Sequence, residues 1–147
     1  MAVRVKAKIT SKESSRSMET SLLLNTGYEA LGSRLLLPKR LAEELEIKKG
    51  QIHIEARTSL GIGRLTVPGV KALVEVEGKM AEADVRISDA ENEAIANDAL
   101  IELLKIEILR PKEGVYRFSD DPSGKFRKST SPKFWQLPES LNYVKVF

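Results

Sequence analysis

Apolar and polar residues alternate along much of this chain, and a period of two predicts β-strands. Residues 3–9 show it most clearly, with Val, Ala and Ile at odd positions and Arg and Lys at even ones. A second strand is predicted from Met18 to Leu24, after a polar loop. It ends in three consecutive leucines, which indicates burial on both faces just before Asn25.

The alternation returns between Gln51 and Ser88, where a turn is expected at residues 59–63. The residues expected on the buried faces of its first two strands are Ile52, Ile54, Ala56, Leu65 and Val67. Two further hairpins are predicted, one around Glu77-Gly78-Lys79 and one around Lys112-Glu113-Gly114.

Two short helices interrupt the strands. Pro38 is expected to open the first, and residues 48–50 to end it. The second runs from Asp98 to about Lys105, with Asn97 or Asp98 as its N-cap. The apolar stripes are Leu41, Leu45 and Ile47 in the first helix and Leu100, Leu103 and Leu104 in the second. A mainly β chain of 147 residues with two short helices indicates one domain, built as a barrel or a sandwich.

The composition excludes several kinds of chemistry. The chain has no Cys, which removes disulfides, thiolate metal sites and a cysteine nucleophile. Its one His, His53, alternates with isoleucines and is expected on the outward face of a strand, which argues against a catalytic triad or a histidine metal site. We therefore expect no metal and no cofactor.

The charges are nearly balanced, with 24 basic and 21 acidic residues interspersed, as is typical of a solvated surface. Nothing in this balance indicates nucleic acid. No apolar run is long enough to span a membrane and no signal-peptide core is present, so a cytoplasmic protein is expected. Abundant Lys and Glu without Cys favour a thermophilic source.

Residues 119–147 differ in character, because aromatic and basic residues are interleaved there. The aromatic residues are Phe126, Phe134, Trp135, Tyr143 and Phe147. Such a segment can bind nucleic acid by phosphate contact and stacking. We favour instead an arm that packs its aromatic residues on its own barrel or on a second subunit.

The most informative stretch is Leu22 to Glu29, where an apolar strand runs directly into Asn25-Thr26-Gly27. These three residues are also compatible with an ordinary turn. The segment resembles the Asp-Thr-Gly signature of the retropepsin-like aspartic proteases, with Asn25 at the position of the catalytic Asp.

The substitution matters because of the chemistry that the resemblance implies. Two carboxylates about 3 Å apart share one proton, so that one acts as a base toward water while the other polarises the scissile carbonyl. An amide does neither, although it has nearly the same shape and can hydrogen-bond a peptide. The expected result is an inactive protein whose cleft binds a peptide or protein ligand without cutting it.

The resemblance extends from residue 3 to residue 118. Residues 35–45 are similar to the strand and short helix that follow the signature in bacterial and archaeal members. Leu60, Gly61, Ile62 and Gly63 fall where the family has its flap, and Glu93 to Leu100 resembles the second signature, with Ala96, Asn97 and Asp98 supporting the active site. Ala96 stands where Gly is usual, and the interval from Gly27 to Pro38 is longer than the common pattern.

The resemblance implies a closed β barrel with one or two short helices, forming one subunit of a homodimer, because each chain supplies one signature turn. The hydroxyl of Thr26 would bond across the twofold axis, and Gly27 would let the backbones approach. Residues 1–118 would be the protease-like domain and residues 119–147 an arm that could join the dimer interface. Asn25 is either natural or a change made to silence an active enzyme.

A competing interpretation rests on residues 33–56. The run Arg34-Leu35-Leu36-Leu37-Pro38, a short helix, Lys48-Lys49-Gly50 and a return strand also resembles the AbrB-type DNA-binding fold. That resemblance leaves the Asn25 turn and the second helix unexplained. An unrelated β barrel acting as an interaction domain is the remaining alternative.

Overall fold

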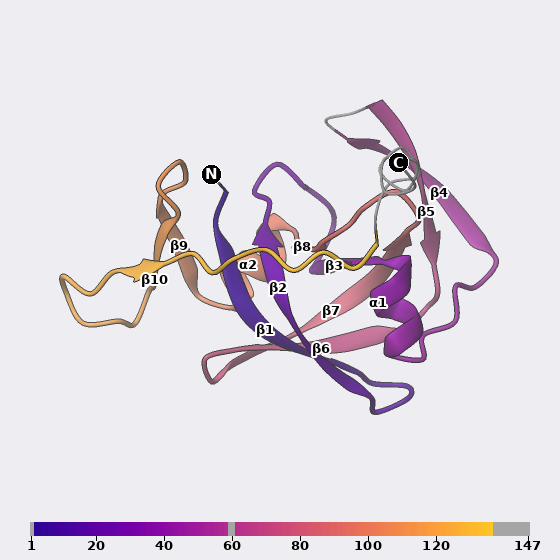
Figure 1. The fold of residues 1–147 in the computed structure, drawn as a ribbon, viewed down its shortest axis with the longest axis horizontal. Helices are drawn as coiled ribbons and strands as arrows, with labels where there is room; N and C mark the ends of the chain where they lie inside the picture. The colour runs from indigo at the N-terminus through magenta and orange to yellow at the C-terminus, as the bar shows by residue number, and fades with distance from the viewer. Residues whose placement is uncertain (1, 59–60, 137–147) are drawn as a thin grey trace, which may run out of the picture.

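The computed structural model describes residues 2–58 and 61–136 (Figure 1). The strands in the described residues are β1 (Arg4–Ser11), β2 (Ser17–Leu24), β3 (Arg34–Pro38), β4 (Ile52–Thr58), β5 (Gly61–Val67), β6 (Lys71–Val76), β7 (Lys79–Ser88), β8 (Ala94–Ala96), β9 (Ile106–Arg110), β10 (Val115–Phe118) and β11 (Arg127–Lys128). The helices there are α1 (Lys39–Glu44) and α2 (Asp98–Leu103). Neither helix is long and apolar enough to span a bilayer.

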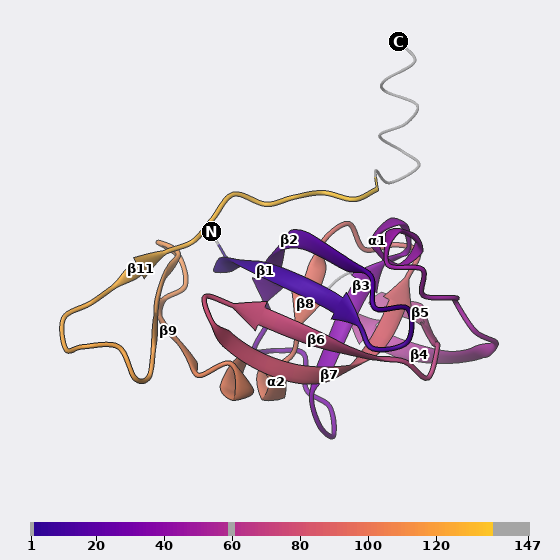
Figure 2. The ribbon, with the colours of Figure 1, turned by 90° about the horizontal axis from the view of Figure 1, so that it is seen from below.

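Six strands close into a barrel, in the order β3-β8-β2-β1-β6-β7, with β7 pairing back onto β3 (Figures 1 and 2). The closing pair is parallel and joins residues 34–38 to residues 84–88. The pair of β2 and β8 is also parallel, with Leu24 opposite Ala96. The prediction of a mainly β protein with a closed barrel and two short helices is therefore confirmed.

The barrel interior is filled by the alternating apolar residues of the strands. Val3, Val5, Ala7 and Ile9 are all buried, as the period of two predicts. Leu22 and Leu24 face the same interior, whereas Leu23 faces outward. There it packs on a second, smaller group, the outer apolar cluster, which consists of Leu23, Tyr28, Leu36, Leu65 and Ile95. The leucine triplet is thus covered on both faces.

The hairpin of β4 and β5 projects from the barrel (Figure 1). It is attached through β5 alone, where Leu65 pairs with Ser88 and Thr66 with Ile87. The expectation that Ile52 and Ile54 are buried is wrong, since they are 63% and 40% exposed. The reason is that β4 is an edge strand whose one neighbour in the sheet is β5, and among the described residues these isoleucines are not part of either core cluster.

The predicted turn of this hairpin is also too long. Gly61, Ile62 and Gly63 belong to β5 and pair with Thr58, Arg57 and Ala56. Leu60, the remaining residue of the predicted flap, lies outside the described residues.

Both helices end earlier than expected, because a residue with positive φ turns the chain. Glu46 (φ 54°) follows α1, and Lys105 (φ 59°) follows α2. After α1, the N–H groups of Glu46 and Ile47 donate to the carbonyl oxygens of Glu43 and Ala42, which is the Schellman pattern. Pro38 is the last residue of β3 and occupies the N-cap position of α1, so the first helical residue is Lys39 and not Pro38 as expected.

Glu46→Gly is expected to stabilise the fold by about 0.5–1 kcal/mol, because glycine adopts a positive φ without the steric cost that a side chain carries. The measurement is urea unfolding. Glu43→Gly is the control, since the same change inside α1 should destabilise by about 1 kcal/mol. If Glu46→Gly lowered the free energy of unfolding as much as Glu43→Gly does, this explanation of the helix end would be wrong.

The chain beyond the barrel folds back over it. β9, β10 and β11 form a separate sheet, and residues 129–136, here called the strap, run across β1 and β2. The N–H of Thr130 donates to the carbonyl of Arg4 (2.9 Å) and the indole of Trp135 donates to the hydroxyl of Thr20 (2.8 Å). The described part of the arm therefore lies on its own barrel, whereas Tyr143 and Phe147 lie outside the described residues.

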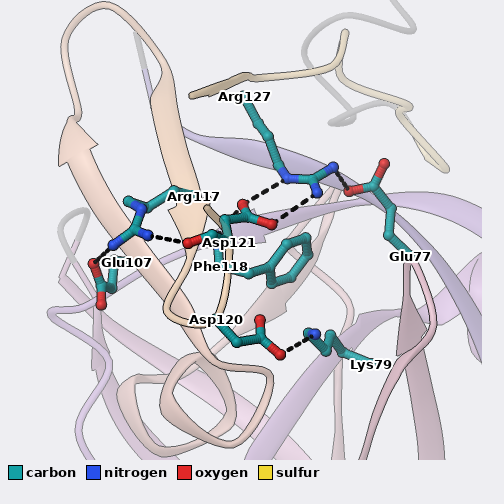
Figure 3. A network of polar contacts seen from close by, with 8 residues as sticks. All are labelled: Glu77, Lys79, Glu107, Arg117, Phe118, Asp120, Asp121 and Arg127. Carbon is teal, nitrogen blue, oxygen red and sulfur yellow. Dashed lines mark hydrogen bonds and ion pairs between the residues drawn. The ribbon is translucent and has the colours of Figure 1, made fainter. Parts of the chain in front are cut away.

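An ion-pair network joins this second sheet to the turn between β6 and β7 (Figure 3). Arg127 donates to both carboxylate oxygens of Asp121 (2.9 and 3.0 Å) and to Glu77 (2.6 Å). Its guanidinium also lies 4.9 Å from the ring centre of Phe118, which is buried. The network fixes the start of the arm, and with it the strap, to the barrel.

This network predicts a loss of stability in acid. The hydrogen bonds from Arg127 and from the N–H of Phe118 hold the pKa of the Asp121 carboxyl well below its usual range. A lowered pKa in the folded state means that the stabilisation is present at neutral pH and is lost as the pH falls below about 4. By urea unfolding, Asp121→Asn should therefore be less stable than the parent at pH 7, and this difference should shrink as the pH falls from 4 toward 2. If the difference in free energy of unfolding between Asp121→Asn and the parent stayed constant with pH, the stabilisation would not come from the charge of Asp121.

Candidate active site

The Asn25 turn (Asn25-Thr26-Gly27) lies where β2 meets β8. The N–H of Asn25 donates to the carbonyl of Ala96 (3.0 Å), one residue beyond the pairing of Leu24 with Ala96. The structure thus brings together the two segments that the sequence singled out, since Asn25 and Ala96 are 71 positions apart in the chain. Asn25, Thr26 and Gly27 are all exposed on the single subunit.

The side chain of Asn25 is held by its own turn. Its Oδ1 accepts from the N–H of Gly27 (3.0 Å), and its carbonyl accepts from the N–H of Tyr28 (3.1 Å). A Cβ at Gly27 would lie 3.3 Å from that Oδ1, so glycine leaves room for this side-chain position. A carboxylate at position 25 could keep the same hydrogen bond, which favours the charged form of the acid.

Asn97 ties the chain after the turn to α2. It is fully buried, and its Oδ1 accepts from the N–H groups of Arg34 (2.9 Å) and Leu100 (3.0 Å). Its Nδ2 donates to the carbonyl of Gly32 (3.0 Å). Asn97 is therefore the N-cap of α2, which is one of the two N-cap residues predicted from the sequence. It also holds residues 32–34 through its hydrogen bonds to Gly32 and Arg34.

Ala96 and Asp98 have different surroundings. Ala96 is fully buried in the main core together with Leu24, its partner in register. Its methyl group thus fills the barrel interior. Asp98 begins α2, where its Oδ1 accepts from the N–H of Ala99 (2.7 Å) and its own N–H donates to the carbonyl of Tyr28 (3.2 Å). No hydrogen bond between the side chains of Asp98 and Asn25 is found in the described residues.

The β4–β5 hairpin packs on the outer apolar cluster, two members of which adjoin the Asn25 turn in the chain. Leu65 of β5 is buried against Leu36 and Ile95, and Leu23 and Tyr28 pack on the same group. Ile54 is opposite Leu65 and shares its face of the hairpin, because directly opposed residues project to the same side. The base of the hairpin thus covers apolar residues that adjoin Asn25 along β2 and in the following loop.

The sequence carries no local signal for two residues at the outer apolar cluster, Tyr28 and Arg86. Burial raises the pKa of the Tyr28 phenol, and the positive charges of Arg86 and Arg34 oppose that shift. Arg86 is opposite Leu36 only because β3 and β7 pair in parallel, a register for which the sequence carries no local signal.

The described residues contain no cluster of His, Asp and Glu suited to a metal ion. Two concave surfaces, one along α1 and one between the strap and β1, are not lined by the Asn25 turn. The Asn25 turn itself is exposed at the surface of the chain.

Comparisons with known proteins find structural likeness without a match in sequence. No family model matches the sequence, and no curated protein matches it. The chain is similar to the protease of simian foamy virus (mac), solved in solution, with 19% identity and a TM-score of 0.42 over 72% of this chain and 99% of that chain. A likeness at this level settles neither family nor activity, so the function is inferred from the geometry of the Asn25 turn.

Proposed function

We propose that this protein is a retropepsin-like aspartic peptidase subunit that lacks catalysis because of Asn25 and retains a peptide-binding cleft. The observation that carries the proposal is the placement of Asn25 at the exposed end of a buried strand, hydrogen-bonded to Ala96 of β8. This contact between the Asn25 turn and β8, together with the resemblance of both segments to the family signatures, supports the proposal.

The absence of catalysis follows from the amide. The Nδ2 of Asn25 can only donate, and neither amide atom can take a proton from water near neutral pH. A pair of such turns would supply neither a general base nor a shared proton. The protein as it stands should leave an unfolded protein substrate such as casein intact from pH 3 to pH 8. Robust cleavage, free of contaminating protease, would overturn the assignment of the site.

A homodimer is part of the proposal. Thr26 is exposed, and its hydroxyl has no hydrogen bond to the described residues of its own subunit. Leu31, in the loop after the turn, is 92% exposed. A twofold axis near Thr26 would pair the turns and cover such groups.

Sedimentation tests the assembly. A stable interface typically buries about 1,200 Å² or more in total, and an interface of that size is expected here. The protein should sediment as a dimer at micromolar concentration. A monomer at high micromolar concentration would count against a paired cleft, whatever the chemistry of residue 25.

The AbrB-type alternative stays a prediction. Residues 34–38 form β3, whose two edges pair with β7 and β8 inside the barrel. No observation here favours DNA as a ligand. Binding to duplex DNA that weakens steeply between low and moderate salt would revive that alternative.

A further inference from the structure

Arg86 differs from its neighbours on the outward face of β7. That face carries Glu82, Asp84 and Arg86 at alternate positions. Glu82 pairs with Lys12 (2.7 Å) and Asp84 pairs with Arg34 (3.0 Å). Within residues 2–58 and 61–136, Arg86 forms no ion pair, and its guanidinium donates to the carbonyl of Val85 (3.0 Å).

The surroundings make this unpaired charge unusual. Arg86 is half-buried, and it is opposite Leu36, a member of the outer apolar cluster. Arginine is rarely buried without a partner, because removing its charge from water is costly. The guanidinium also acts on the phenol of Tyr28, whose burial-raised pKa it lowers. Arg86 therefore lies at the edge of the outer apolar cluster, to which Tyr28 also belongs.

Tyr28 connects this charge to the Asn25 turn. Its N–H donates to the carbonyl of Asn25, and its ring packs on the outer apolar cluster. A ligand lying on the turn and this cluster would bring its side chains next to Arg86. Arg34, the other cation near Tyr28, already holds Asp84.

We propose that Arg86 recognises a carboxylate of the bound ligand, so that the cleft selects peptides with Asp or Glu at one fixed position among apolar residues. This inference rests on the proposed peptide-binding function and adds the ligand class. The apolar cluster takes the neighbouring side chains, and Arg86 offers a planar donor pair that matches a carboxylate. Reduced access to water strengthens such a pair.

The test uses the full-length protein and a library of fluorescent octapeptides. Each peptide has an apolar background with Glu, Gln or Lys at one scanned position, and binding is followed by fluorescence polarisation. Glu at a single position should bind roughly tenfold more tightly than Gln there. Arg86→Gln should remove that difference, and Arg86→Glu should favour Lys at the same position. Arg86→Lys should keep part of the preference for Glu.

Arg64→Gln is the matched control. Arg64 is exposed and pairs in register with Glu55, on the face of the hairpin opposite to Leu65. This variant should bind the library as the parent does. Circular dichroism verifies that each variant is folded.

The outcomes separate the two proposals. Peptides that bind without a preference for Glu, or a preference that survives Arg86→Gln, would overturn the role of Arg86 and leave peptide binding standing. Failure of every peptide to bind the folded dimer would remove the proposed function, and the role of Arg86 with it.

Discussion

Replacing Asn25 by Asp is expected to turn a protein without peptidase activity into an acid-favoured endopeptidase. The carboxylate would keep the hydrogen bond from the N–H of Gly27, and two such turns at a twofold axis would form a dyad that shares one proton. One ionised and one protonated acid supply the base and the electrophile that the amides lack. Cleavage of casein between pH 3 and pH 6 should exceed the background of the Asn25 protein roughly 10³-fold or more.

The control for this gain is the inhibitor pepstatin, which should block the activity as the family resemblance implies. Asp98 belongs to α2 and has no hydrogen bond to Asn25 in the described residues, so Asp98→Asn in the Asn25→Asp background should retain cleavage. An Asn25→Asp variant that is folded and dimeric but inert would mean that the defect extends beyond residue 25. The long loop before Pro38 and the β4–β5 hairpin would then be the parts to examine.

Asn97→Ala is expected to cause the largest loss of stability among single changes near the turn. The fully buried amide makes three hydrogen bonds, and its removal leaves the N–H groups of Arg34 and Leu100 and the carbonyl of Gly32 without this partner. A buried polar group left unpaired costs about 1–3 kcal/mol, which applies in full to Leu100, whereas Arg34 is half-buried and Gly32 exposed and should lose less. We expect the free energy of unfolding to fall by about 3 kcal/mol in urea.

Two variants show whether the loss comes from this amide. Asp98→Ala removes the neighbouring polar side chain, which is only half-buried and bonds within α2, and should cost less than about 1 kcal/mol. Asn97→Asp keeps the acceptor for Arg34 and Leu100 but loses the donor to Gly32, so its loss should be intermediate. Similar losses for Asn97→Ala and Asp98→Ala would show that Asn97 acts only as a helix cap.

Local sequence patterns predicted those parts of the fold that depend on interactions between residues close together in the chain. The alternation in residues 3–9, the leucine triplet before Asn25 and the N-cap at Asn97 all act over a few residues, and each appears in the structure as expected. The burial of Ile52 and Ile54 was predicted wrongly, because alternation cannot show that a strand stands at an edge without a covering layer.

Ion pairs between side chains far apart in the chain left no local pattern in the sequence. The bidentate pair of Arg4 with Glu93 joins residues 89 positions apart, and the pair of Arg127 with Glu77 joins residues 50 positions apart. Arg86 reaches the neighbourhood of Tyr28 through the register of β3 and β7. The Asn25 turn could be predicted because its three residues are consecutive. The position of Arg86 opposite Leu36, in contrast, follows only from the folded chain.

The most direct test of the central claim, that the Asn25 turn meets its copy across a twofold axis, is a disulfide at Thr26. The chain has no Cys, so Thr26→Cys introduces a single thiol at the exposed turn. A disulfide needs Cα atoms about 4.4–6.8 Å apart, a distance that paired turns would meet. Under mild oxidation, Thr26→Cys should become a covalent dimer almost completely, while Ser123→Cys, exposed between β10 and β11, should remain monomeric on a denaturing gel. Cross-linking of Thr26→Cys no faster than that of Ser123→Cys would contradict the paired site.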